Sequence, residues 1–280
     1  MQASVRRSNP LLPVALALWA GAAVAAPPER VVSMNLCTDQ LAMLLAAPGQ
    51  LLSVSHLSLD PLSSAMVEEA RAYPINRGGA EQIFLMHPDL VLAGTYTARA
   101  SVDLLRGLGI EVVQLPPADT LQDVAAHMRL IGTALGRAEQ GEAMAQAFES
   151  DLAALGFDGA PVTAAMYYPN GYTAGSGTLS DAILTLTGFA NVGAEAGLTG
   201  GGILPLERLV IAEPTVVVTS TPYPGASRAE EILTHPALDA IRNDAARASV
   251  RDADWVCGTP HILNAIRTMA QTRAAIGASE

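Results

Sequence analysis

The sequence predicts an α/β protein of two lobes, each with a Rossmann-like parallel sheet, joined by a long α-helix. In both halves of the 280-residue chain, short apolar runs alternate with segments of helical periodicity. This alternation is typical of parallel sheets covered by helices. A long helical stretch from Thr120 to Leu155 separates the halves. Its position predicts a strut between the two lobes.

The N-terminal lobe is expected over residues 27–136. Its strand-like runs are rich in valine and leucine, and proline or glycine bounds most of its elements, as expected where elements end. We expect strands at 30–35, 51–55, 89–93 and 110–115, and helices at 39–47, 62–72, 80–86 and 101–108.

The central stretch has apolar residues at spacings of three, four and seven, which indicates amphipathic helix. Thr120 and Asp123 have the spacing of a capping box. Because Gly132, Gly136 and Gly141 weaken the middle, we expect two helices, at 120–136 and 138–155. The second would be about 28 Å long, enough to cross a small domain, so residues 137–156 are the predicted bridging helix.

The C-terminal lobe is expected over residues 157–280 and repeats the same alternation. Its predicted strands are 162–168, 215–219 and a segment around 248–250; its predicted helices are 179–187, 206–212, 229–233, 236–242 and 260–276. Residues 169–177 are expected to be a loop. The cluster Gly200-Gly201-Gly202 is also expected to be a loop, because no phosphate-binding lysine or serine follows these glycines.

The first 26 residues have the layout of a signal peptide. Arg6 and Arg7 precede an apolar run from Leu11 to Val24 that ends in small residues. The run is short for a membrane span. Because no cysteine follows it directly, we expect a cleaved signal peptide at 1–26 and an exported protein that is not a lipoprotein.

Composition and motifs argue against two classes of function. The net charge is −11 and no basic run occurs, so nucleic acid is not an expected partner. The chain has no Gly-x-Ser-x-Gly, paired-histidine or phosphate-loop motif. We therefore expect a binding protein and not an enzyme, with an exported hydrolase as the weakest alternative.

The two halves share one local pattern. Glu81 lies seven residues before Pro88, and Glu207 lies seven residues before Pro214. In each case matched apolar positions lie between, and a strand-like run follows the proline. This repetition favours two similarly built lobes.

These motifs, with the Arg30–Asn35 run and the central helices, resemble periplasmic binding proteins of the ferric-siderophore and cobalamin class, the substrate-capturing components of ABC importers. The resemblance covers residues 29–276. It implies a ligand cleft between two lobes, a rigid helix between them, small domain closure and a periplasmic location. The implied ligand is an iron- or cobalt-containing chelate, with no covalent cofactor, and we expect a monomer.

The resemblance also implies a partner, the dimeric ABC permease of the inner membrane. In this class one exposed glutamate per lobe docks onto permease arginines, and by motif these are Glu81 and Glu207. The competing interpretation is that both carboxylates only stabilise helix N-termini.

Ligands of open α/β sheets bind beyond the carboxyl ends of the strands. Several polar and aromatic residues follow predicted strands, which suits a large planar or chelated ligand. The candidate cleft residues are Asn35, Cys37, His56, Tyr96, Tyr168, Tyr172, Tyr223, Trp255 and Cys257. Arg77, Arg99 and Arg228 are candidates for contact with anionic groups of a ligand, although solvated surface charge is the simpler interpretation.

The two cysteines have three interpretations. Cys37 and Cys257 form a disulfide that ties the lobes together, which an exported compartment permits. Alternatively, with His56 and His261, they bind metal, which leads to the alternative function of binding a bare zinc- or manganese-type ion. The third interpretation, two buried free thiols, is the one we favour from sequence.

Overall fold

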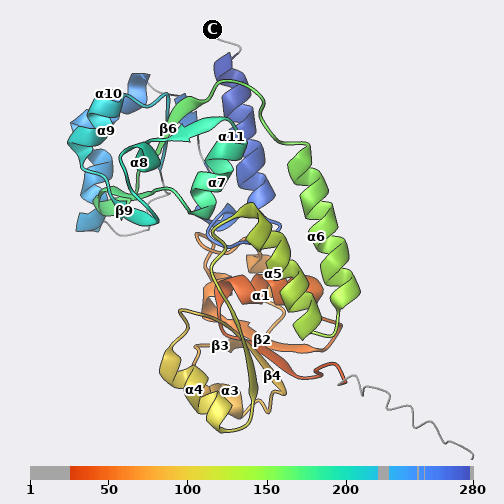
Figure 1. Cartoon of the computed structure of the whole chain (residues 1–280). Helices are drawn as coiled ribbons and strands as arrows, with labels where there is room; N and C mark the ends of the chain where they lie inside the picture. The colour runs from red at the N-terminus through yellow and green to blue at the C-terminus, as the bar shows by residue number, and fades with distance from the viewer. Residues whose placement is uncertain (1–25, 220–226, 245, 249, 278–280) are drawn as a thin grey trace, which may run out of the picture.

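The computed structural model describes residues 26–219, 227–244, 246–248 and 250–277, and shows two α/β lobes stacked along one long helix (Figure 1). The predicted fold class is confirmed. Each lobe is built on its own parallel sheet, and the sequence patterns explain why: valine-rich runs form buried strands, and amphipathic segments cover them.

The N-terminal lobe has a five-stranded sheet in the order β3-β2-β1-β4-β5, with every neighbouring pair parallel. Its strands are β1 (Val31–Ser33), β2 (Leu51–Ser55), β3 (Ile75–Asn76), β4 (Leu90–Gly94) and β5 (Glu111–Leu115). Its helices are α1 (Leu36–Leu45), α2 (Val67–Ala70), α3 (Ala80–Phe84) and α4 (Arg99–Gly107), with a 3-10 turn η1 (His56–Leu59).

The C-terminal lobe has a four-stranded parallel sheet in the order β11-β10-β6-β8. Its strands are β6 (Val162–Met166), β8 (Phe189–Asn191), β10 (Val216–Val218) and β11 (Ala246–Ala248); β7 (Tyr172–Ala174) and β9 (Gly201–Ile203) form a separate antiparallel pair. Its helices are α7 (Leu179–Leu186), α8 (Val192–Glu195), α9 (Leu206–Ala212), α10 (Pro236–Asp244) and α11 (Ile262–Gly277), with 3-10 segments η2 (Pro169–Gly171), η3 (Arg228–Thr234) and η4 (Asp252–Asp254).

The two sheets have corresponding topologies. In each lobe the first strand, β1 or β6, pairs with the strand that follows the glutamate-bearing helix, β4 or β10. The residue before the proline is left-handed in both connections, with φ 49° at His87 and 42° at Glu213. The shared Glu–Pro–strand pattern therefore corresponds to one connection used twice.

Two helices connect the lobes, α5 (Leu121–Ala134) and α6 (Ala138–Ala153). The predicted capping box is present, because the Thr120 hydroxyl accepts from the Asp123 amide at 3.1 Å and the Asp123 carboxylate accepts from the Thr120 amide at 2.8 Å. Helix α6 runs beside α5 and reaches the C-terminal lobe (Figure 1), where Arg267 of α11 pairs with Asp151 at 3.0 Å. Helix α6 is thus the strut, and the numerical lobe boundaries at 136/137 and 156/157 stay a prediction.

The glycines of the central stretch have a packing role that the sequence interpretation missed. A Cβ on Gly132 would lie 2.7 Å from the Gly141 Cα, and one on Gly141 would lie 2.7 Å from the Met128 carbonyl oxygen. Gly136 has φ 69° and forms the turn between the helices, a conformation that costs glycine little. The glycines therefore let α5 and α6 pack backbone to backbone.

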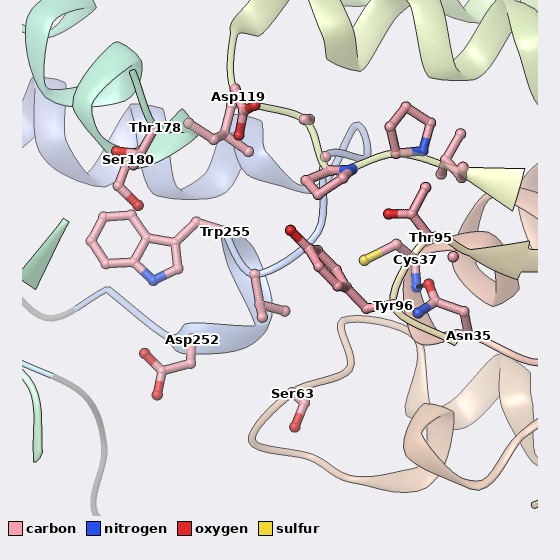
Figure 2. A pocket seen from close by; sticks show the side chains of 18 of the residues that line it. Asn35, Cys37, Ser63, Thr95, Tyr96, Asp119, Thr178, Ser180, Asp252 and Trp255 are labelled. Atoms are coloured by element: carbon pink, nitrogen blue, oxygen red, sulfur yellow. Dashed lines mark hydrogen bonds between the residues drawn. The ribbon is translucent and has the colours of Figure 1, made fainter. Parts of the chain in front are cut away.

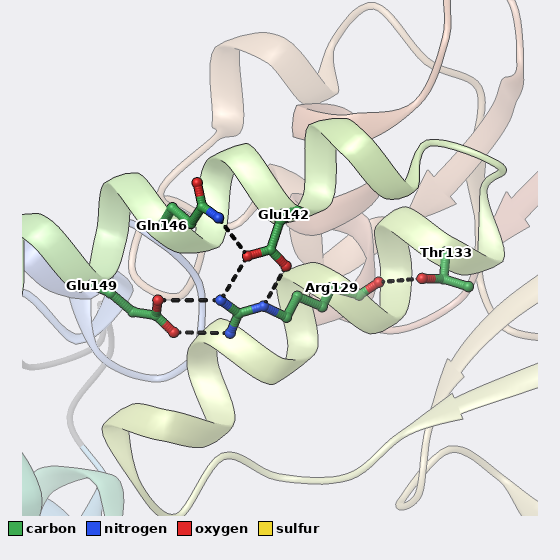
Figure 3. A network of polar contacts seen from close by, with 5 residues as sticks. All are labelled: Arg129, Thr133, Glu142, Gln146 and Glu149. Atoms are coloured by element: carbon green, nitrogen blue, oxygen red, sulfur yellow. Dashed lines mark hydrogen bonds and ion pairs between the residues drawn. The ribbon is translucent and has the colours of Figure 1, made fainter.

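A polar network clamps the same pair of helices (Figure 3). Arg129 of α5 donates to Glu142 at 2.7 and 3.1 Å and to Glu149 at 2.8 and 3.2 Å, both on α6. Gln146 also donates to Glu142 at 2.9 Å. The hydrogen bonds with the two carboxylates raise the pKa of Arg129 and lower those of Glu142 and Glu149. The bidentate geometry fixes the register of the two helices.

The hydrophobic core is continuous between the lobes. One cluster joins Leu41 and Leu92 of the first lobe, Met128 and Phe148 of the central helices and Ile266 of the second lobe. Each sheet has one further cluster on its other face. This cluster packs against α3 and α4 in the first lobe and against α9 in the second. Shared burial of this kind opposes large lobe separation, because opening would expose the common apolar contacts.

Two local predictions were wrong. The helix expected at 62–72 is only α2, because the Asp60 side chain accepts from the Leu62 amide at 3.0 Å and the Ser63 hydroxyl at 2.5 Å, which stabilises a turn instead. The loops at 169–177 and 200–202 contain β7 and β9. A Cβ on Gly201 would overlap the Tyr172 hydroxyl, so any larger residue there would displace the Tyr172 ring.

Among the described residues, no helix combines the length and apolar character that a bilayer span requires. The signal-peptide prediction falls on residues 1–26, of which only Ala26 is described.

Candidate functional site

A cavity of about 670 Å³ lies between the two lobes. Its volume is within the range of small-molecule sites. The first lobe contributes Asn35, Cys37, Leu62, Ser63, Gly94, Thr95, Tyr96, Leu115, Pro116, Pro117, Ala118, Asp119 and His127; the second contributes Tyr168, Pro169, Tyr172, Thr178, Leu179, Ser180, Glu230, Asp252, Trp255, Val256 and Gly258. Most of the first-lobe residues follow the carboxyl ends of β1, β4 and β5, as the strand-end rule predicts.

On the first-lobe side, Asn35 caps helix α1 through its Oδ1 atom, which accepts from the Cys37 amide at 3.0 Å. A Cβ on Gly94 would lie 2.8 Å from Asn35 Nδ2, so the end of β4 approaches this asparagine closely. Tyr96 follows β4 and is 89% exposed. Figure 2 shows its ring between Trp255 and the group formed by Asn35, Cys37 and Thr95.

On the second-lobe side, three aromatic residues come from three segments. Tyr168 follows β6, Tyr172 begins β7, and Trp255 follows η4. Trp255 is buried (7% exposed), whereas Tyr172 is 47% exposed. Burial, and to a smaller extent the Asp252 carboxylate, hold the pKa of Tyr168 well above its usual range, so its hydroxyl stays a hydrogen-bond donor. Together these rings provide stacking surface for a planar ligand.

The described lining contains carboxylates and no arginine. Asp119, Glu230 and Asp252 line the cavity, and burial raises the pKa of Asp252. His127 also lines it, and burial lowers the pKa of this histidine despite the nearby Asp123. A site with this charge is better suited to a neutral or cationic ligand than to a polyanion.

The cysteines form a disulfide, Cys37–Cys257, with Cα atoms 5.1 Å apart. It joins the start of α1 to the segment that precedes α11. Around it, the Thr259 hydroxyl lies 3.3 Å from Gln40 Oε1, and a Cβ on Gly258 would lie 2.4 Å from the Ala118 side chain. This junction is a second tie between the lobes, in addition to α6.

The disulfide corrects the sequence interpretation. The favoured interpretation of two free thiols is wrong, because both sulfurs are bonded to each other. For the same reason Cys37 and Cys257 are not available as thiolate metal ligands together with His56 and His261. In the described part of the chain, no group of three histidine, cysteine or acidic side chains is arranged to hold a metal ion.

The structure brings most of the predicted cleft residues to one cavity and leaves others out. Asn35, Cys37, Tyr96, Tyr168, Tyr172 and Trp255 line it. Cys257 adjoins it through the disulfide, His56 is exposed at the start of η1, and His261 is half-buried outside the lining. Tyr223 lies outside the described residues. Arg77, Arg99 and Arg228 are exposed and do not line the cavity.

Some lining residues escaped the sequence analysis. Leu115 ends β5 and residues 116–119 follow it, so the strand-end rule applied to the proline pair would have found them. Thr178 and Ser180 belong to the start of α7, and His127 faces the cavity from α5. Only the packing of α5 and α7 against the opposite lobe places these three, and no local pattern signals it.

Residues 31–248 match the sequence profile of the family described as "Periplasmic binding protein". This match spans more than half of the chain. The chain belongs to the periplasmic binding protein family.

Within this family, curated relatives match at low identity. A cobalamin-binding protein of Halobacterium salinarum is 27% identical over 230 residues, which are 79% of this chain and 62% of the relative. A vitamin B12-binding protein of Pectobacterium carotovorum is 28% identical over 174 residues, covering 59% of this chain and 62% of the relative. The chain thus spans less than two thirds of the length of these relatives.

Solved periplasmic binding proteins share the fold. The apo form of the periplasmic heme-binding protein RhuT from Roseiflexus sp. RS-1 superposes with a TM-score of 0.71 at 20% identity, over 88% of this chain and 99% of the other. The periplasmic vitamin B12-binding protein BtuF of Vibrio cholerae gives a TM-score of 0.67 at 20% identity, over 89% and 98% of the two chains. At such identities the similarity establishes the architecture.

Proposed function

We propose that this protein captures a metal chelate outside the cytoplasm and delivers it to an ABC permease. The observation that carries the proposal is the interlobe cavity, with aromatic side chains from both lobes around it. A ligand in that position contacts both sheets at the carboxyl ends of their strands, so binding and the relative position of the lobes are coupled.

Within the chelate class, we favour a neutral or cationic ligand of the corrinoid type. Asp119 and Asp252 line the cavity, and the described lining has no arginine to neutralise carboxylate or catecholate oxygens. Two curated relatives are named as cobalamin- or vitamin B12-binding proteins. The alternative of a bare transition-metal ion loses its proposed soft ligands, because Cys37 and Cys257 are bonded to each other.

The ligand test uses the chain from residue 27, in which Trp255 is the single tryptophan. Its fluorescence is titrated with cyanocobalamin, haemin, cationic ferrioxamine, trianionic ferric enterobactin and zinc chloride. We expect saturable one-to-one quenching by cyanocobalamin that is at least tenfold tighter than binding of the trianionic chelate. Binding of zinc alone, or of none of these ligands, would contradict the proposal.

We further propose that Glu81 and Glu207 dock onto arginines of the permease. Both side chains are exposed, and both lie in the first turn of the corresponding helices α3 and α9. Two carboxylates on separate lobes fix the orientation of a rigid body, and arginine binds carboxylate in a bidentate manner.

Charge reversal tests the docking. Glu81→Arg with Glu207→Arg should abolish chelate uptake through the permease and leave the Trp255 titration unchanged. The matched control is Glu139→Arg, because Glu139 is an exposed first-turn glutamate of α6. Normal uptake by the double variant would disprove this role of the glutamates.

We also propose that residues 1–26 are a cleaved signal peptide and that the released protein is a monomer without a lipid anchor. Lipoprotein acylation requires a cysteine side chain. Both cysteines of this chain, Cys37 and Cys257, are joined to each other in the disulfide. One curated relative, the uncharacterized lipoprotein YvrC of Bacillus subtilis, is named as a lipoprotein, so the test matters. Intact-mass measurement of the exported protein should show loss of the leader and no acyl mass.

A further inference from the structure

We propose that two exposed apolar pairs, Phe84–Leu85 at the C-terminal end of α3 and Val210–Ile211 on α9, form with Glu81 and Glu207 two equivalent docking patches for a two-fold symmetric permease. Each docking patch consists of one glutamate and the apolar residues three and four positions after it. The inference rests on the proposed transport function and extends its docking surface from single charges to apolar anchors.

The two patches occupy corresponding places in the fold. Helix α3 leads into β4, which pairs with β1; helix α9 leads into β10, which pairs with β6. One residue in each helix points inward and is fully buried, Ile83 in the first lobe and Leu209 in the second. Both lie two positions after the glutamate, so the two apolar residues that follow the buried one have the same register in both lobes and are exposed.

The exposure of the outward-facing residues matches between the lobes. Phe84 is 39% exposed and Val210 is 40% exposed, three positions after the glutamate. Leu85 is 66% exposed and Ile211 is 78% exposed, four positions after it. None of the four belongs to a hydrophobic core cluster of the described residues.

A single exposed leucine needs no explanation, since apolar atoms make up much of any protein surface. Here, however, an exposed apolar pair recurs at corresponding sites of the two lobes. The left-handed residues His87 and Glu213 end both segments before a proline. The repeated exposure therefore indicates a partner that offers the same site twice, as a C2 dimer does.

Charge complementarity identifies the chemistry of that partner. Each patch places a carboxylate beside apolar side chains, on a chain with a net charge of −11. The complement is a recess with apolar walls and an arginine at its rim. Apolar anchors surrounded by polar contacts are the usual arrangement of energetically important interface positions. In Figure 1, α3 and α9 lie in different lobes, on the side of the molecule away from α6.

The experiment measures binding of the full exported chain, loaded with cyanocobalamin, to the permease dimer in lipid nanodiscs by biolayer interferometry. The test variant is Leu85→Gln with Ile211→Gln. The control is Leu130→Gln, because Leu130 is 40% exposed on α5, outside both patches. We expect the double variant to bind at least tenfold more weakly, with the control and the Trp255 titration unchanged.

Three outcomes would overturn the inference. Unchanged permease binding by the double variant, while Glu81→Arg with Glu207→Arg abolishes it, would leave the proposed function intact and exclude the apolar pairs. Equal binding to empty nanodiscs would identify lipid as the occupant. Concentration-dependent dimers in sedimentation velocity that the double variant loses would identify a second copy of this chain. If no chelate quenches Trp255 in the wild type, the proposed function itself fails, whatever the docking result.

Discussion

Cys37 and Cys257 are joined by a disulfide although 220 residues separate them in the sequence. The bond lies at the edge of the interlobe cavity, next to the contact of Gly258 with Ala118. Together with α6 it gives the lobes two connections at different places. A ligand therefore meets a cleft whose opening is restricted by covalent structure, and small closure is the expected response.

Removing this bond should destabilise the protein. Cys37→Ser with Cys257→Ser is expected to lower the free energy of unfolding by about 2–4 kcal/mol, because a long loop in the unfolded chain is no longer closed. Urea unfolding with and without dithiothreitol measures it. The serine variant should be insensitive to the reductant, and equal stability of reduced and oxidised wild type would contradict the expectation.

The close packing of α5 and α6 predicts opposite signs for two glycine substitutions. Gly141→Ala places a Cβ 2.7 Å from the Met128 carbonyl oxygen and should destabilise by about 1–3 kcal/mol through overpacking. Gly107→Ala in α4 has no heavy atom within 4 Å of its Cβ and should be neutral or stabilise by up to about 1 kcal/mol. Thermal unfolding of both variants tests the comparison, and equal effects would refute the packing role.

Gly201→Ala should affect ligand binding more than folding. The new Cβ would overlap the Tyr172 hydroxyl, and the exposed Tyr172 ring can turn away at little cost to stability. That movement takes a ring from the cavity wall, so we expect cyanocobalamin affinity to fall about tenfold, equivalent to about 1.4 kcal/mol. The Trp255 titration measures it, with Gly107→Ala as the control. A large loss of melting temperature with normal affinity would be the contrary result.

Tyr96 is the most exposed of the aromatic rings described at the cavity, so a substitution there can separate ligand binding from stability. Because it is 89% exposed, Tyr96→Ala should leave the melting temperature unchanged. Loss of its stacking should weaken cyanocobalamin binding by about 1 kcal/mol, roughly fivefold. Leu104→Ala, which removes a 54% exposed side chain from α4 outside the cavity, serves as the control. Unaltered affinity of Tyr96→Ala would remove this residue from the site.

One buried histidine, His127, and one half-buried histidine, His261, predict a pH dependence of stability. Burial lowers the pKa of His127 and of His261 below the ordinary 6.5, so the folded state binds fewer protons than the unfolded state. Their contribution is therefore present above pH 6.5 and is lost as the pH falls toward the lowered values, by up to about 1.4 kcal/mol per pH unit for each group.

Asp39 contributes to the pH dependence of stability in the opposite direction, because burial raises its pKa. Protonation of Asp39 at acid pH favours the folded state, so the comparison must be made between variants. Urea unfolding at pH 8.0 and 5.5 should show a smaller loss of stability for His127→Gln with His261→Gln than for wild type. An unchanged pH difference would show that these histidines do not set the slope.

The local sequence determined most of the elements and their order, although it missed the β7–β9 pair. Valine runs, helical periodicity and the Glu–Pro–strand repeat predicted two parallel-sheet lobes and the strut, because these patterns reflect burial within a few residues of chain. The strand-end rule predicted that Asn35, Tyr96 and Tyr168 lie at the cavity, because each closely follows a strand that the local sequence indicates.

Only the tertiary structure decided how distant segments meet. It joined Cys37 to Cys257, turned His127 of α5 toward the cavity, and showed that Gly141 is a contact and not a weak point of the helix. It also left the predicted arginines outside the site. These outcomes depend on distances between segments tens to hundreds of residues apart, and residue type and local periodicity carry no information about such distances.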